Sequence, residues 1–137
     1  MSIGSVPTMN FILHQLDESL ATQLCEAVSE AGHVFHATAS TSECLSVAER
    51  LHADVVFCNA DRGRYQSLLG ALQRRGLPLS VVVVSRIPET SDWLDALDAG
   101  AADYCAAPFE HRHLSWLIQS AMLAAQRVPA PVLSGAR

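Results

Sequence analysis

The residues best suited to do chemistry follow directly after three short apolar runs of the sequence. The first run is followed by residues 15–18 (QLDE), the second ends in residues 59–61 (NAD), and the third ends on Ser85. Carboxylates such as those of Asp17 and Asp61 could hold a hard cation such as Mg²⁺, which prefers oxygen ligands. The neutral amides and the hydroxyl could instead hydrogen-bond a polar ligand without a metal.

Several kinds of enzyme site are excluded by residue type alone. All nine basic residues are arginine, so no lysine can contact a phosphate or form a Schiff base. The sequence has no glycine-rich phosphate loop and no GxSxG nucleophile elbow. Residues 111–113 (HRH) place two histidines on different faces of a predicted helix start, which favours a solvated helix end over a metal site. We therefore expect no catalytic residue, no resident metal, no cofactor and no enzymatic activity.

Composition limits the protein class further. The chain has 137 residues, half of them hydrophobic, and a formal net charge of −5, which fits one domain with a single core. Scattered arginines in an acidic chain disfavour a nucleic-acid surface. No apolar run approaches the roughly 18 residues of a membrane span, and residues 1–9 lack the features of a secretory signal. We expect a cytoplasmic protein whose four cysteines are reduced thiols in the core.

The elements that must position these residues alternate regularly. Five apolar runs, three of them continuous and rich in β-branched residues, predict buried parallel strands at residues 11–14, 33–37, 54–59, 80–85 and 102–106. Segments with helical periodicity lie between them, and three of these segments stop at a glycine: Gly32, Gly76 and Gly100. This pattern predicts an α/β fold: a single doubly wound (βα)5 domain with a five-stranded parallel sheet. We place a lead at residues 1–9, the domain at 10–127 and a Pro/Ala-rich tail or linker at 128–137.

The segment Ala99–Phe109 (AGAADYCAAPF) resembles the GADDY-x-x-K-P-F signature of response regulator receiver domains in two-component signalling. The matching residues are Gly100, Ala101, Asp103, Tyr104, Pro108 and Phe109. The run DVVFCN resembles the strand that carries the phospho-accepting aspartate of this family, and the resemblance extends over residues 10–122. It implies the flavodoxin-like receiver fold with strand order 2-1-3-4-5.

At the phosphorylation site, however, this sequence departs from the family pattern. The acidic pair falls on Gln15 and Leu16, the acceptor on Asn59 and the lysine on Ala107, and only Ser85 matches. Neither an amide nor an isobutyl group binds Mg²⁺ well, and an asparagine amide does not form an aspartyl phosphate. The resemblance thus predicts an atypical receiver that acts as a regulatory, phosphorylation-independent protein-interaction module.

Two alternatives remain open at this stage. A one-residue shift would bring Asp17, with Glu18 and Asp61, into a noncanonical carboxylate site that supports Mg²⁺-dependent phosphorylation. These same carboxylates would otherwise lie at helix N-termini, where the helix dipole favours them. The second alternative is a flavodoxin-like domain in which the neutral cluster of Gln15, Asn59 and Ser85 binds a polar small molecule.

The resemblance also implies where partners would bind. Tyr104 matches the aromatic residue that changes rotamer with the hydroxyl at Ser85, on the face formed by the fourth helix, fifth strand and fifth helix. We expect this face, with Trp93, Trp116 and Leu117, to contact a protein partner or a second copy in a dimer, and to bind neither nucleic acid nor membrane. The bond before Pro108 matches one that is typically cis in the family. Atypical receivers also precede ATPase domains in pilus-assembly localisation proteins, so residues 128–137 are compatible with a linker.

Overall fold

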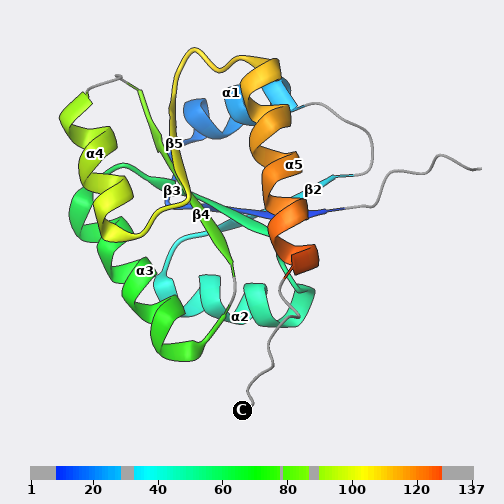
Figure 1. Cartoon of the computed structure of the whole chain (residues 1–137), viewed down its shortest axis with the longest axis vertical. Coiled ribbons are helices and arrows are strands. Elements are labelled where there is room, and N and C mark those ends of the chain that lie inside the picture. Colours follow the sequence, from blue (N-terminus) through cyan, green and yellow to red (C-terminus); the bar gives the residue numbers. More distant parts are fainter. Residues whose placement is uncertain (1–8, 29–32, 78, 87–89, 128–137) are drawn as a thin grey trace, which may run out of the picture.

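The computed structural model describes residues 9–28, 33–77, 79–86 and 90–127, in which five strands alternate with five helices (Figure 1). The strands are β1 (Asn10–His14), β2 (Val34–Thr38), β3 (Val55–Asn59), β4 (Ser80–Ser85) and β5 (Asp103–Ala106). The helices are α1 (Glu18–Val28), α2 (Thr41–Leu51), α3 (Arg62–Arg75), α4 (Thr90–Ala99) and α5 (His111–Arg127). The predicted (βα)5 arrangement is confirmed.

The strands form one parallel sheet in the order β2-β1-β3-β4-β5, as predicted. The central strands β3 and β4 are buried along nearly their whole length, which explains their uninterrupted apolar sequences. The strands β2 and β5 are the two edges, and β2 is the more exposed, with Val34 at 43%. Because parallel strands end at the same edge of the sheet, the sequence segments after β1, β3 and β4 come together there.

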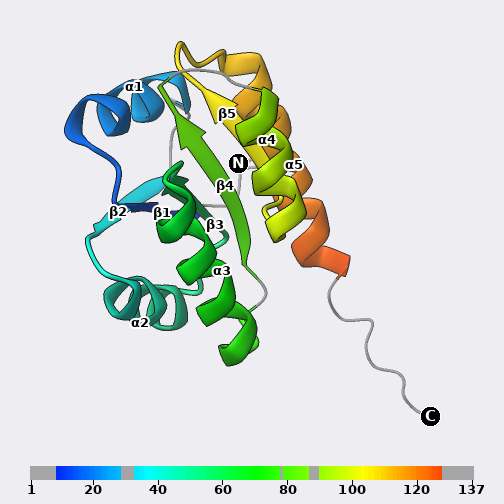
Figure 2. The ribbon, with the colours of Figure 1, turned by 90° about the vertical axis from the view of Figure 1, so that its left-hand side faces the viewer.

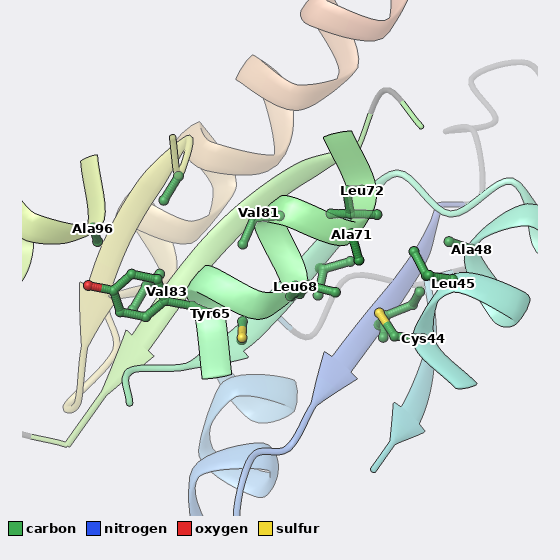
Figure 3. Close-up of a cluster of buried hydrophobic side chains, with 14 of the residues drawn as sticks. Cys44, Leu45, Ala48, Tyr65, Leu68, Ala71, Leu72, Val81, Val83 and Ala96 are labelled. Atoms are coloured by element: carbon green, nitrogen blue, oxygen red, sulfur yellow. The ribbon is translucent and has the colours of Figure 1, made fainter. Parts of the chain in front are cut away.

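Helices cover both faces of the sheet (Figure 1). α1 and α5 pack on one face, against side chains that include Phe11 and Phe57. α2, α3 and α4 pack on the other face, where Figure 3 shows Leu68 of α3 near Val81 and Val83 of β4. Burial of each such large side chain contributes about 1.5–3 kcal/mol, so these two layers hold the sheet between them.

Local capping signals fix where the helices start and stop. The Ser40 hydroxyl accepts a hydrogen bond from the Glu43 amide (3.1 Å) and so caps α2. Gly76 ends α3 in the left-handed conformation, at φ 67°, which a residue without a side chain adopts without strain. None of the helices in the described ranges combines the length and hydrophobicity needed to cross a membrane.

The structure corrects three details of the sequence prediction. The second strand begins at Val34 and ends at Thr38, one residue later than predicted. Met9 is assigned to the N-terminal lead, but its side chain is only 3% exposed and belongs to the core. Its carbonyl accepts the Val34 amide (3.0 Å), which extends the pairing of β1 with β2 by one residue. Three cysteines are buried free thiols, but Cys25 is only half-buried. The rest of the lead, the expected helix stop at Gly32 and the tail at 128–137 lie outside the described residues.

Candidate functional site at the carboxyl ends of the strands

Gln15 and Leu16 follow β1 where the family pattern has its acidic pair. Gln15 adopts a left-handed backbone conformation (φ 58°), and its amide N–H donates to the Thr38 carbonyl at the end of β2 (2.9 Å). Its side-chain Nε2 donates to the Ala39 carbonyl (3.0 Å). Leu16 is partly buried against the α1/α5 core. These two side chains therefore connect β1 to its neighbours and present no carboxylate to a cation.

Asn59 lies at the end of β3, where the family pattern has its phospho-acceptor. Its Nδ2 donates to the Gln15 carbonyl (3.0 Å), and its Oδ1 accepts the Asp61 amide (2.7 Å). Both ends of the amide are thus engaged by backbone groups, of Gln15 on one side and of Asp61 on the other. The side chain links the β1 turn to the start of α3, and an amide held in this way offers no nucleophilic oxygen.

Asp17 and Asp61, the carboxylates of the alternative magnesium site, both cap helices. Asp17 Oδ1 accepts the Leu20 amide of α1 (2.8 Å), and its Oδ2 forms an ion pair with Arg86. The hydrogen bond from Leu20, helped by Arg86, holds the pKa of Asp17 below its ordinary value. Asp61 Oδ2 accepts the Arg64 amide of α3 (3.2 Å). No group of three metal-binding side chains is found in the part of the chain that the structure describes.

Ser85 and Ala107 complete the set of positions implied by the resemblance. The Ser85 side chain is half-buried at the end of β4, and its carbonyl accepts the Ala107 amide (2.9 Å). Ala107 packs against the α1/α5 core, and the Ala107–Pro108 bond is cis, as expected. Arg86 also lies at this edge of the sheet, and it pairs with Asp17. This carboxylate therefore has a cationic partner within the protein.

His14 is a feature of this region that the sequence reasoning did not single out. The side chain is fully buried, with its Nδ1 2.8 Å from the Thr38 hydroxyl and its Nε2 without a hydrogen-bond partner. Burial lowers the pKa of His14, and Arg64 lowers it further. The sequence could have indicated its burial, because His14 lies in an apolar strand two residues after Ile12. Alternate residues of a strand face the same side of the sheet.

The predicted interaction face is divided between exposed and buried side chains. Trp93 on α4 is 42% exposed and Trp116 on α5 is 59% exposed. Tyr104 is 8% exposed and packs in the α2–α4 layer. Leu117 is 7% exposed and packs beneath α5, so its assignment to the interaction surface was wrong. It lies beside Leu114 and Ile118 on the inward side of the helix, one residue from outward-facing Trp116.

Two cavities lie beside this face, and the larger one extends past the carboxyl end of β5 to Pro108 and Phe109. The larger, about 520 Å³, is lined by all four residues of β5, by Trp93 of α4 and by residues of α5 and the segment before it. The smaller, about 150 Å³, lies under Trp116 and Leu117. Gln15, Asn59 and Ser85 line neither cavity, so neither supports the small-molecule alternative.

Comparison with known proteins identifies the fold. No protein-family model matches the chain, and no curated protein matches it. Solved structures do. A CheY-like protein (tadZ) from Pseudomonas aeruginosa PAO1 is 24% identical, with a TM-score of 0.70 over 82% of this chain and 98% of that chain.

Two further structures agree with that match. A response regulator receiver protein from Pseudoalteromonas atlantica is 20% identical (TM-score 0.67, 85% of this chain and 98% of that chain). The receiver domain of the Francisella response regulator 1452 is also 20% identical (TM-score 0.64, 87% and 98%). Together with the strand order β2-β1-β3-β4-β5 and the AGAADYCAAPF segment, these matches establish that the chain has the fold of a response regulator receiver domain.

Proposed function

We propose that this chain is an atypical receiver domain that acts in two-component signalling as a non-enzymatic protein-interaction module, without being phosphorylated. The absence of phosphorylation is inferred from the hydrogen bonds of the Asn59 side chain. Its amide is hydrogen-bonded to the Gln15 carbonyl and the Asp61 amide, in the position where phosphorylation would require a free carboxylate. The residues at this site therefore connect parts of the fold, whereas the corresponding residues of the family pattern take part in phosphorylation.

Phosphoryl transfer would also need a Mg²⁺ site and a lysine, for which this site lacks the residues. A phosphoryl group in transit carries developing negative charge, which Mg²⁺ and a lysine ordinarily offset. The nearby carboxylates of Asp17 and Asp61 are engaged as helix caps, and Ala107 replaces the lysine. Redirecting either aspartate to a metal would uncap α1 or α3, which disfavours the carboxylate alternative.

The interaction half of the proposal rests on exposed apolar side chains. Five large hydrophobic residues are exposed in the described ranges, and four of them lie on α4 and α5: Trp93, Leu94, Leu97 and Trp116. Three of these side chains lie together within residues 93–97 of α4, and an exposed apolar patch on a small domain commonly marks a contact with another protein. Tryptophan in particular is enriched among residues that dominate binding energy.

The decisive experiment is an NMR titration with Mg²⁺ and beryllofluoride, a mimic of the aspartyl phosphate. We expect no saturable shift of the backbone amides around Asn59, and no change at Tyr104. The control is the triple variant Gln15→Asp/Asn59→Asp/Ala107→Lys, which restores one member of the acidic pair, the acceptor and the lysine and should respond. Saturable shifts around Asn59 in the unaltered protein would refute phosphorylation independence and favour the carboxylate alternative.

The interaction surface has its own test. Trp93→Ala and Trp116→Ala remove the two largest exposed side chains, and light scattering and partner-binding assays compare each variant with the unaltered protein. We expect at least one of them to reduce self-association or partner binding. Unchanged behaviour of both variants would rule out this surface.

A further inference from the structure

The larger cavity lies around an open edge of the sheet. β5 pairs with β4 on one side only, and the cavity of about 520 Å³ is lined by all four residues of this strand, Asp103–Ala106. α4 and α5 cover opposite faces of the sheet, and Figure 2 shows both helices beside β5, at the far end of the sheet from α2. The volume is within the roughly 300–1,000 Å³ range of ligand-binding clefts.

The walls of this cavity combine aromatic and acidic side chains. Trp93 and Phe109 contribute apolar surface, and Asp103 and Glu110 contribute carboxylates. Among the residues that line the cavity, His113 is the one with a basic side chain, and no arginine is present. The cavity therefore offers apolar contact next to uncompensated negative charge.

One of the two acidic groups is fixed by a backbone hydrogen bond, and the other is exposed. Asp103 Oδ1 accepts the Tyr104 amide (2.7 Å), which fixes the carboxylate at the strand edge. Within the described ranges, neither Asp103 nor Glu110 takes part in an ion pair; the arginine nearest to α4 in the fold, Arg62, pairs with Asp95 instead. A cationic group brought by another molecule would find both carboxylates available.

We propose that this cavity binds a basic, apolar segment of a partner protein, with arginine side chains pairing with Asp103 and with Glu110 and a neighbouring apolar side chain packed on Trp93. The inference rests on the proposed function, because it specifies what the α4–β5–α5 face binds. Charge complementarity supports this occupant: α4 carries Asp92, Asp95 and Asp98 and no basic residue, and the cavity lining adds Asp103 and Glu110. A guanidinium can also stack on an indole ring, which suits the exposed face of Trp93.

Trp93 itself provides the readout. The chain has two tryptophans, so Trp116→Phe leaves Trp93 as the single fluorescent indole. Two synthetic twelve-residue peptides are titrated into this variant: one alternates leucine with arginine, and the other has glutamate in place of every arginine. We expect a saturable change in Trp93 emission with the arginine peptide, lost in high salt, and none with the glutamate peptide.

Charge variants localise the binding site. Asp103→Asn/Glu110→Gln should weaken binding of the arginine peptide by about 2- to 30-fold, the range for two partly exposed ion pairs. The matched control Glu18→Gln/Glu26→Gln changes the net charge equally on exposed positions of α1 and should leave the affinity unchanged. Circular dichroism confirms that both variants are folded.

Three results would overturn the inference: equal binding of both peptides, equal weakening by both double variants, or no saturable response. A change in Trp93 emission with protein concentration alone would identify a second copy as the occupant and also overturn it. The beryllofluoride titration does not involve the cavity. A failed peptide experiment therefore leaves the phosphorylation-independent function standing, and saturable shifts around Asn59 would overturn that function without affecting the cavity.

Discussion

The buried histidine of β1 should make the stability of this protein depend on pH. His14 is fully buried, and its Nε2 has no hydrogen-bond partner, so a proton added there would be a buried charge without compensation. Desolvation lowers its pKa from the unfolded-chain value of 6.5; Arg64 on α3 lowers it further, and Glu43 on α2 partly opposes the shift. The folded protein thus keeps His14 neutral at a pH where the unfolded chain takes up a proton.

The sign and size of the effect follow from this difference in bound protons. Above pH 6.5 both states are neutral at His14 and the residue adds no pH dependence. As pH falls below 6.5, the unfolded state is stabilised by protonation, and the free energy of unfolding decreases by up to about 1.4 kcal/mol per pH unit. The decrease stops once the pH is below the lowered pKa of the folded state. Between pH 6 and pH 5 we therefore expect this one group to reduce the free energy of unfolding, by no more than this limiting slope.

Urea unfolding followed by circular dichroism at a series of pH values measures this dependence. His14→Gln keeps a polar side chain opposite the Thr38 hydroxyl but cannot titrate, so its stability should change less between pH 6 and pH 5. His113→Gln, on the exposed start of α5, is the matched control and should retain the full dependence. Asp17 does not confuse the result, because its pKa is lowered and its effect falls below pH 4. An identical pH dependence in His14→Gln and the unaltered protein would refute the reasoning.

Three further predictions concern packing, backbone conformation and thiol reactivity. Leu68→Ala, at a fully buried position of α3, should reduce the free energy of unfolding by about 2–5 kcal/mol in urea titrations; a loss below 1 kcal/mol would contradict the packing described. Gly70→Ala, where the added Cβ meets only the flexible end of Arg74 at 3.4 Å, should stabilise α3 by about 0.5–1 kcal/mol. Gly76→Ala should destabilise α3 by about 1 kcal/mol because of the positive φ at this position. Thermal melts test the two glycine variants, which should shift the melting temperature in opposite directions. Iodoacetamide should modify half-buried Cys25 first, since burial raises the pKa of the other three thiols to about 11 or 12, and peptide mass spectrometry that finds another cysteine labelled first would contradict this.

The sequence by itself determined the fold and showed which reactive groups of the family pattern are missing. Buried parallel strands must be apolar on both faces, so runs such as Ser80–Ser85 predicted the strands, and their alternation with helical segments predicted the sheet. The loss of reactive groups is a matter of residue type: Asn59 and Ala107 lack a carboxylate and an ammonium group in any conformation. Local sequence sufficed because these properties depend on one residue or on its near neighbours.

The tertiary structure decided how the remaining side chains are used. The sequence allowed Asp17 to bind a metal or to cap a helix; the cap on Leu20 is local, and the tertiary fold adds Arg86, 69 residues away, as the partner of the same carboxylate. Leu117 and Trp116 are adjacent in sequence, yet the rotation of α5 against the sheet buries one and exposes the other. The cavity along β5 exists because helices from opposite faces flank an edge strand. Each of these outcomes depends on contacts between residues far apart in the chain, which local periodicity does not specify.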